Sequence, residues 1–394
     1  MSGERYDPVA NPYAPGAGTP PPALVGRDHT IETAELSLRR LAAGRSTQHL
    51  LLTGLRGVGK TVLLGKLASV GERVGFRVVR LEAVGGDDAI VSMLRQASRI
   101  IEELDRTPRV ARALRSIDAV SLSIGGTGIR VRKPARSPDR EALADVLIDV
   151  AAAAGEQELG VMLALDEAQM LDNEDLRRIL AGVHRCGQDA LPLWCLLAGL
   201  PNLVGIAAKA STYAERMFTV DQLGPLSPEQ VRDAVVAPSK ELAVSWSPEA
   251  IDTVIDRSDG FPFFVQVWAY HTWNAALDEP ISADDVERAS PAARLALDAS
   301  FFAARIARIP ESEVAYVRAL ASLGPGPHRS GEVAAALDKK TPEVAAFRDR
   351  LIREGLVFSP RYGWIEFAIP HIDAHVRRTL PPLDEVVGQE PDGA

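Results

Sequence analysis

Hydrophobic residues in the first 225 positions follow two patterns, short continuous apolar runs and longer segments with apolar residues at helical spacing. The continuous runs are typical of strands buried on both faces of a sheet. They lie at 48–53, 160–167 and 193–199, and two further strands that include polar residues are expected over 76–82 and 216–220. Because segments of helical pattern separate these runs, the sequence predicts a parallel α/β sheet covered by helices on both faces.

After Ser227 the pattern changes to helices alone. Helices are expected over 228–236, 248–258, 262–274, 282–289 and 292–306. Together they predict an all-helical, lid-like domain over 226–308. Three more helices are expected over 312–323, 330–337 and 341–354, followed by a hairpin with its turn at 360–363. Three helices and a hairpin predict a C-terminal winged helix-turn-helix over 309–380.

Three segments interrupt this organisation. Residues 1–23 are rich in proline and glycine, and this composition favours disorder. Within the core, taken as 24–225, a Gly-rich turn between alternating apolar residues predicts a β-hairpin insertion near 105–137. That insertion is locally basic through Arg130, Arg132, Lys133 and Arg136, although a solvated loop is the alternative. Residues 381–394 form an acidic tail.

Composition narrows the classes of protein. The chain has 394 residues, which is too long for one compact core and suits two or three domains. Its net charge of −9 argues against a general nucleic-acid coat, while one local basic face stays compatible with it. The two cysteines give neither a disulfide framework nor a zinc spacing, so a cytoplasmic location is expected. The sequence predicts no membrane span.

The segment from Gly54 to Thr61 fits the phosphate-binding P-loop pattern G-x-x-x-x-G-K-[ST]. A predicted strand precedes it and a predicted helix follows it, which is the context that this chemistry needs. Glycines let the backbone approach phosphates, and the helix N-terminus presents unpaired N–H groups to an anion. Lys60 is expected to reach the β- and γ-phosphates. The expected nucleotide-binding positions are Gly54, Gly57, Gly59, Lys60, Thr61 and Val62.

Two carboxylates, Asp166 and Glu167, end the apolar run at 160–167. Open parallel sheets bind ligands at the carboxyl ends of their strands, which places this pair beside the P-loop. Asp166 is expected to hold Mg²⁺ together with Thr61, and Glu167 to polarise the attacking water. Without the P-loop, a surface Asp-Glu pair would be the simpler interpretation.

The P-loop, the motif Asp166-Glu167-Ala168-Gln169 and the helical lid resemble the AAA+/STAND branch of P-loop ATPases. Within this branch the chain looks most similar to origin-recognition-type initiator ATPases and transposition-helper ATPases. The resemblance implies ATP as the nucleotide, Mg²⁺ as cofactor and a nucleotide-dependent homo-oligomer. It also implies further site residues. These are Val25 and Arg27 over the adenine, Pro262 in a nucleotide-sensing lid motif, and Arg216 as an arginine finger or sensor, in cis or from a neighbouring subunit. For Arg216 a surface salt bridge is the alternative.

Two positions depart from this family pattern. The strand at 193–199 ends in Ala198-Gly199, where the family places a polar sensor, and Asn202 is the nearest polar candidate. The lid carries Gln266 where an arginine is expected. Both departures favour slow hydrolysis or a nucleotide-state switch over brisk turnover.

The C-terminal domain raises the question of a partner. Basic residues on its predicted recognition helix and wing are candidates for contact with duplex DNA. They are Lys339, Lys340, Arg348, Arg350, Arg353 and Arg361. Acidic residues dilute this charge, so a protein-binding winged helix is the alternative. The sequence therefore predicts a Mg²⁺-dependent ATPase that moves a DNA-associated winged helix, or a STAND-like signalling switch with slow turnover.

Overall fold

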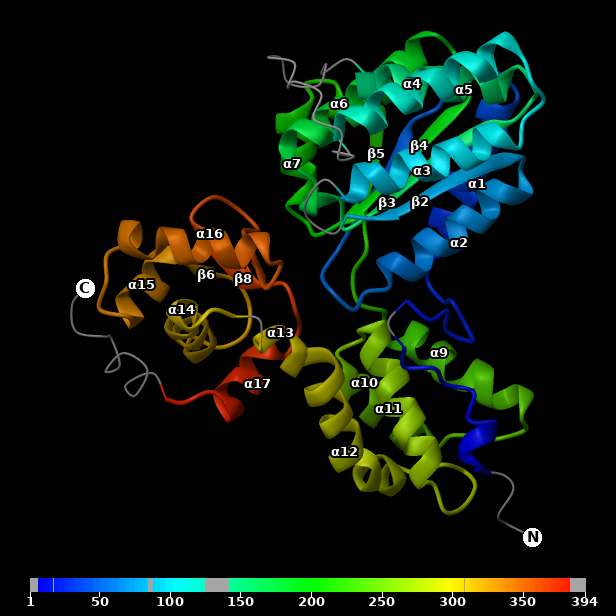
Figure 1. Cartoon of the computed structure of the whole chain (residues 1–394). Coiled ribbons are helices and arrows are strands. Elements are labelled where there is room, and N and C mark those ends of the chain that lie inside the picture. The colour runs from blue at the N-terminus through cyan, green and yellow to red at the C-terminus, as the bar shows by residue number, and fades with distance from the viewer. Residues whose placement is uncertain (1–5, 17, 84–87, 125–141, 308, 383–394) are drawn as a thin grey trace. The chain divides into compact units, whose positions relative to one another are not determined.

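The computed structural model describes residues 6–16, 18–83, 88–124, 142–307 and 309–382 (Figure 1). The chain divides into two compact units, which are described separately. The core unit contains 27–54 and 60–222. The second unit contains 1–26, 55–59 and 223–394.

Five parallel strands form the sheet of the core unit, in the order β2-β3-β4-β1-β5 (Figure 1). Their bounds are β1 His49–Thr53, β2 Phe76–Glu82, β3 Gly160–Asp166, β4 Leu193–Gly199 and β5 Phe218–Gln222. Every residue of β3 and β4 is buried, which explains why these strands read as continuous apolar runs. The predicted parallel α/β core is confirmed.

Helices cover both faces of this sheet. They are α1 Asp28–Ala42, α2 Lys60–Arg73, α3 Asp88–Glu102, α4 Pro108–Ile124, α5 Ala142–Gly155, α6 Asn173–Gln188, α7 Leu203–Ala210 and α8 Ala214–Met217. On β3, Met162 faces Gly71 of α2. Its neighbour Leu163 belongs to a hydrophobic core shared with α3, α4, α5 and α6. Because adjacent strand residues point to opposite faces, α2 and the α3–α6 group lie on opposite sides of the sheet.

The predicted hairpin insertion is wrong where the structure describes it. Helix α4 occupies 108–124, and the basic residues Arg130, Arg132, Lys133 and Arg136 lie outside the described residues. Val110, Ala113, Ile117 and Val120 are buried at helical spacing. Ser116 Oγ also donates to Asp149 Oδ2 at 2.5 Å, which ties α4 to α5. Packing on α5 therefore favours a helix over 108–124, while the Gly-rich turn at 125–128 lies outside the described residues.

The second unit contains the all-helical lid that the sequence predicts. Its helices are α9 Pro228–Glu241, α10 Pro248–Ser258, α11 Pro262–Ala275, α12 Ala283–Leu297 and α13 Ala304–Ile306. A π-helical turn at Asp298–Ala303 joins α12 to α13. Ser227 and Ser282 cap α9 and α12 through capping boxes.

The C-terminal domain follows in the same unit. Its elements are α14 Glu311–Ser322, β6 His328–Arg329, α15 Ser330–Ala336, a 3-10 turn Thr341–Val344, α16 Ala345–Arg353, β7 Val357–Phe358, β8 Trp364–Phe367 and α17 Ile372–Thr379. The three strands pair antiparallel in the order β6-β8-β7. This order of helices and hairpin is the one expected of a winged helix-turn-helix.

The N-terminal segment is ordered from residue 6, so the prediction of disorder over 1–23 is wrong for the described part of that range. Tyr13 is 2% exposed, and its hydroxyl donates to the Val235 carbonyl at 2.6 Å. Asn11 Nδ2 donates to the Tyr270 carbonyl at 2.9 Å. The Tyr13 ring also packs edge-on against Trp246 and Trp273. The buried Tyr13 ring and specific hydrogen bonds thus offset the ordering entropy of this proline-rich segment.

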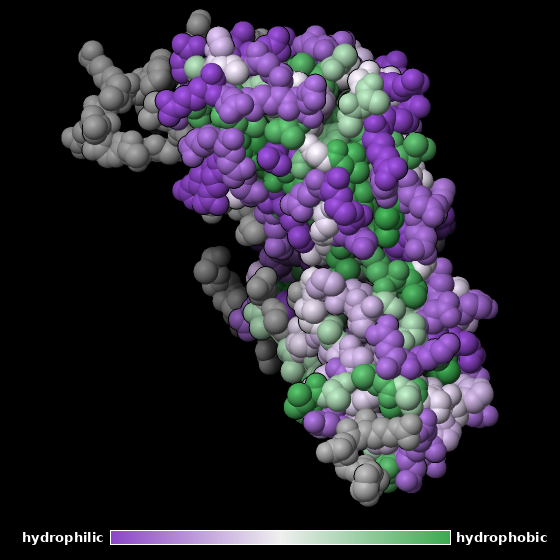
Figure 2. All heavy atoms as spheres, turned by 90° about the vertical axis from the view of Figure 1, so that its right-hand side faces the viewer, coloured by the Kyte–Doolittle hydropathy of each residue, from purple (hydrophilic) through white to green (hydrophobic). Residues whose placement is uncertain are grey.

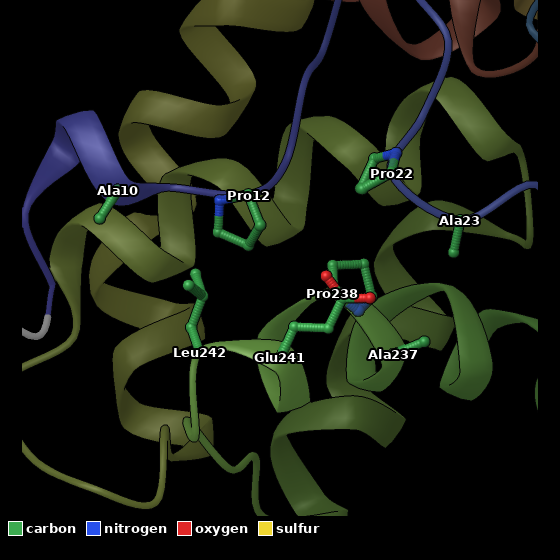
Figure 3. Close-up of a pocket in the computed structure, with 8 residues that line it drawn as sticks. All are labelled: Ala10, Pro12, Pro22, Ala23, Ala237, Pro238, Glu241 and Leu242. Atoms are coloured by element: carbon green, nitrogen blue, oxygen red, sulfur yellow. The ribbon is translucent and has the colours of Figure 1, made fainter.

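A cavity of about 280 Å³ lies between this segment and α9 (Figure 3). Its lining residues come from the N-terminal segment and from the end of α9. They are Ala10, Pro12, Pro22, Ala23, Ala237, Pro238, Glu241 and Leu242. All but Glu241 are apolar or proline, so the cavity marks incomplete packing of the segment against the lid.

We expect Tyr13→Ala to lower the free energy of unfolding by about 3 kcal/mol, because it removes a buried ring and its hydrogen bond. Urea denaturation followed by tryptophan fluorescence measures this change, since Trp246 and Trp273 contact the ring. Val9→Ala is the matched control, because Val9 is 92% exposed on the same segment. An unchanged unfolding midpoint in Tyr13→Ala would show that the segment does not dock in solution.

Hydrophilic residues cover most of the face drawn in Figure 2, with hydrophobic residues in small groups between them. Among the described residues, no helix has the length and apolar character that a membrane span requires.

Candidate functional site

The P-loop joins the end of β1 at Thr53 to the start of α2 at Lys60. Gly57 and Gly59 adopt φ angles of +86° and +91°. Side chains other than glycine are strained in this region, so the turn depends on these two glycines. The loop thereby brings its backbone to the N-terminus of α2, where the N–H groups of the first turn and the helix dipole favour an anion.

Lys60 is buried at the start of α2, with 6% of its surface exposed. Its ammonium donates to the Gly54 carbonyl at 2.9 Å. The Gly54 N–H in turn donates to the carbonyl of Gly199, at the end of β4, at 3.2 Å. The charge of Lys60 is therefore held at the carboxyl edge of the sheet.

Thr61 and Asp166 meet although they lie 105 positions apart. The Thr61 hydroxyl donates to Asp166 Oδ2 at 2.6 Å, and the Glu167 N–H donates to Asp166 Oδ1 at 2.9 Å. Asp166 is 5% exposed. A hydroxyl beside a carboxylate is the hard-oxygen donor set that Mg²⁺ prefers, so the residues present fit a magnesium ion.

Glu167 follows β3 directly and has a left-handed backbone, with φ 49° and ψ 37°. Its Oε2 accepts a hydrogen bond from Gln169 Nε2. The other end of that side chain, Gln169 Oε1, accepts the Leu200 N–H at 3.1 Å. In the sequence, Gln169 belongs to the acidic motif, but the motif alone assigns it no role. Its position two residues after Glu167 is the sequence feature that could have indicated a contact between the two side chains.

Arg27 also lies at the carboxyl edge of the sheet. It is 9% exposed and faces Asp221, which is in register with Leu52 near the end of β1. Burial lowers the pKa of the Arg27 guanidinium, and the charge of Asp221 partly restores it. Val25 belongs to the second unit, where the adjacent Gly26 packs against the Gln230 side chain of α9.

Arg216 lies at the opposite edge of the sheet. It is an exposed residue of α8, just before β5, and Phe218 is in register with His49 at the start of β1. Its guanidinium sits 5.4 Å from the centre of the Tyr213 ring. The structure therefore does not bring Arg216 to the P-loop of its own chain, which corrects the expectation of a role in cis.

The middle of the P-loop bonds to the second unit, to which residues 55–59 belong. The Arg56 N–H donates to the Ala368 carbonyl at 3.0 Å, and Arg56 Nε donates to the Gly355 carbonyl at 3.2 Å. The Gly57 carbonyl accepts the N–H of Phe263 at 3.3 Å, one residue after Pro262 at the start of α11. Both the lid and the C-terminal domain thus contact the loop backbone.

Gln266 and Asn202 are the polar residues at or near the two positions that depart from the family pattern, and their surroundings differ. Gln266 is 7% exposed, and its Oε1 accepts the Ala14 N–H at 3.1 Å, so it holds the N-terminal segment. Asn202 precedes α7, and its buried Oδ1 has no hydrogen-bond partner among the described residues.

Two of the basic candidates of the C-terminal domain form ion pairs. Arg350 Nε lies 2.5 Å from the buried carboxylate of Glu313, and Arg348 lies 3.0 Å from Asp349. These pairs remove Arg350 and Arg348 from the expected DNA-facing set. Four candidates keep that expectation: Lys339, Lys340, Arg353 and Arg361.

Two other titratable groups of the core unit, one on β1 and one on α6, are structural. Burial lowers the pKa of His49 to about 4, and its Nδ1 accepts the Cys195 N–H at 3.2 Å. Burial also raises the pKa of the free Cys186 thiol to about 12. Neither side chain is poised for acid–base or nucleophilic chemistry near neutral pH.

Comparison with family models decides the class of the core. Residues 23–197 match the model described as the AAA ATPase domain. The chain carries an AAA ATPase domain. This AAA domain implies nucleotide binding. Residues 299–376 match a model described as a domain of unknown function, DUF8462.

One solved structure shows the same type of fold at low identity, and two others align with the chain at TM-scores below 0.5. A Walker-type ATPase of Pyrococcus abyssi is 16% identical over 90% of this chain and 96% of its own, with a TM-score of 0.54. The ORC2 protein of Aeropyrum pernix in its ADP form is 17% identical over 95% and 97%, with a TM-score of 0.48. The RuvB Holliday junction branch migration motor of Thermotoga maritima is 15% identical over 90% and 96%, with a TM-score of 0.45. No curated protein matches the chain.

Proposed function

We propose that the chain binds ATP with Mg²⁺, hydrolyses it slowly, and passes the nucleotide state to its C-terminal domain. The observation that carries this proposal is the hydrogen bond of 2.6 Å between Thr61 and Asp166. It joins the P-loop to the acidic motif and leaves the buried Lys60 and the Glu167 carboxylate at the same sheet edge.

Each residue has a separate role in this proposal. The Lys60 ammonium binds the β- and γ-phosphates, and the P-loop N–H groups cradle them. Thr61 and Asp166 would hold Mg²⁺, which supplies charge neutralisation when bound. Glu167 orients the attacking water and accepts its proton. Arg216 acts from a neighbouring copy, because it lies at the other edge of its own sheet.

Residues 55–59 provide the route to the C-terminal domain. Phosphate binding needs the loop N–H groups, while Arg56 uses its own N–H and Nε to hold the Ala368 and Gly355 carbonyls. A loop that closes on phosphate must alter these contacts, so the two states of the loop favour two states of the domain. This contact supports a nucleotide-controlled switch.

Equilibrium titration of the purified chain with a fluorescent ATP analogue tests the first step of this proposal. Binding in the presence of Mg²⁺ that weakens when the metal is chelated is the expected result. A chain that takes up no ATP under either condition contradicts the proposal. An ATPase activity per chain that rises with protein concentration would support completion of the site by Arg216 of a neighbouring copy.

A second candidate function is association with duplex DNA through the hairpin of the C-terminal domain. Arg361 and Tyr362 are exposed at its turn, and the Arg361 guanidinium sits 3.8 Å from the centre of the Trp364 ring. Arg329 approaches the same ring at 5.5 Å. Two cations held on one aromatic residue favour contact with phosphates. A protein partner at this surface is the alternative.

We expect Arg361→Ala to weaken duplex binding for all sequences and to reduce the slope of log affinity against log salt by about 1. Fluorescence anisotropy between about 50 and 200 mM salt measures this slope. Lys209→Ala is the control, because Lys209 is an exposed cation on α7 of the core. If the wild-type chain with ATP binds no duplex at the lowest salt, the protein-binding alternative replaces this candidate.

A further inference from the structure

Strand β4 lies between β3 and β1, and therefore between the strands that lead to the acidic motif and to the P-loop. It ends in Ala198-Gly199, which offers no polar side chain. The carboxamide of Gln169 lies at this position instead, because its Oε1 accepts the N–H of Leu200, the next residue, at 3.1 Å. A side chain from the acidic motif thus lies at the end of the neighbouring strand.

The contacts of Gln169 fix the orientation of its amide. Leu200 supplies a backbone donor, so it must meet the amide oxygen, and the amide nitrogen then faces the Glu167 carboxylate. A turned amide would place oxygen against carboxylate and nitrogen against a donor. The contacts of the amide oxygen and of the amide nitrogen therefore require the same orientation, in which Gln169 links the Glu167 side chain to the end of β4.

Gly199 supplies the space for this arrangement. A Cβ added at Gly199 would lie 2.2 Å from Gln169 Oε1, which is too close for any real contact. The Gly199 carbonyl also accepts the N–H of Gly54 at 3.2 Å. The end of β4 therefore touches the first residue of the P-loop on one side and the side chain that holds Glu167 on the other.

We propose that Gln169 is a positioning residue for hydrolysis, which orients the Glu167 carboxylate and links it to the end of β4 and, through Gly54, to the P-loop. The inference rests on the proposed role of Glu167 as the residue that orients water. Gln169 contacts neither Lys60 nor Thr61 in the hydrogen bonds described above. Its loss should therefore lower kcat and leave ATP affinity unchanged.

The test compares kcat and ATP affinity in Gln169→Ala with those of the wild type. We expect kcat to fall at least about tenfold, because an unrestrained carboxylate orients water poorly, while the Kd for ATP changes less than about twofold. Gln188→Ala is the matched control, because Gln188 is exposed at the end of α6. Gly199→Ala should give the same split between kcat and Kd, since it displaces the Gln169 amide.

A double variant separates positioning from a general packing defect. Gly199→Ala combined with Gln169→Ala should lower kcat little more than Gln169→Ala alone, because the obstructed side chain is already absent.

The outcomes for Gln169 and for the proposed function are distinguishable. If Glu167→Gln loses hydrolysis while Gln169→Ala keeps the wild-type kcat, the inference about Gln169 is overturned and the proposed function stands. If Glu167→Gln hydrolyses ATP at the wild-type rate, the proposed role of Glu167 fails first. Additive effects of Gly199→Ala and Gln169→Ala on kcat would also overturn the inference.

Discussion

Lys60→Ala should raise the Kd for ATP at least about 100-fold, because it removes the buried cation that pairs with the phosphates. The magnitude follows from the position of this group. Lys60 is 6% exposed, and its ammonium is already desolvated and held on the Gly54 carbonyl. A phosphate that meets a preplaced, desolvated charge gains more than one that meets a surface lysine. Isothermal titration with ATP and Mg²⁺ measures the change.

Lys66→Ala provides the control for this variant. Lys66 lies on the same helix α2 and is exposed, so its removal changes the net charge equally without touching the P-loop. It should bind ATP as the wild type does. Equal affinity in Lys60→Ala and wild type would exclude the P-loop as the nucleotide site, whatever the activity of the preparation.

Glu167→Gln should bind ATP with wild-type affinity and hydrolyse it about 10²- to 10⁴-fold more slowly, because an amide cannot accept the proton of the attacking water. The substitution keeps the size of the side chain and its place after β3. Asp166 and Thr61 also remain in contact, so magnesium binding should persist. Phosphate release and ATP titration on the same sample separate the two effects.

Glu174→Gln serves as the comparison, because Glu174 lies in the first turn of α6 and forms ion pairs with Arg177 and Arg178. It should hydrolyse ATP normally. A Glu167→Gln chain that loses ATP binding as well would mean that Glu167 holds the metal or the loop and does not act as the base.

Short sequence patterns predicted the strands and the P-loop of the core, because each of these elements depends mainly on residues that are close together in the sequence. Strands β3 and β4 are buried on both faces, so burial alone requires an apolar run. The P-loop could also be predicted from a short segment, because Gly57 and Gly59 adopt positive φ angles that favour glycine. Asp166 could be paired with Thr61 because carboxyl ends of parallel strands share one edge.

The features that sequence reasoning missed depend on contacts between distant residues. Proline content predicted disorder near Tyr13, but the ring finds a buried place against Trp246 and Trp273. Arg350 was counted as a cation for DNA, and its buried partner Glu313 lies 37 positions earlier in α14. Composition carries no information on such pairs, because the partner is chosen by packing.

The role of Gln169 shows the same limit at the candidate site. Its sequence position beside Asp166 and Glu167 was visible, but its contact with Leu200 required the order of strands in the sheet. The sequence shows that Ala198-Gly199 lacks a polar side chain, and Asn202 is the nearest polar candidate along the chain. The structure places the Gln169 amide beside this position, from the turn that follows β3, and proximity in sequence could not reveal that contact.

Single-turnover phosphate release tests the central claim most directly. Wild-type chain in excess over ATP is incubated with Mg²⁺, and released phosphate is followed to completion beside Glu167→Gln, with bound nucleotide measured in both. The account predicts that wild type converts the bound ATP to ADP and phosphate, while Glu167→Gln retains it intact. Wild-type chain that binds no ATP, or that holds it unhydrolysed as long as Glu167→Gln does, would contradict the account.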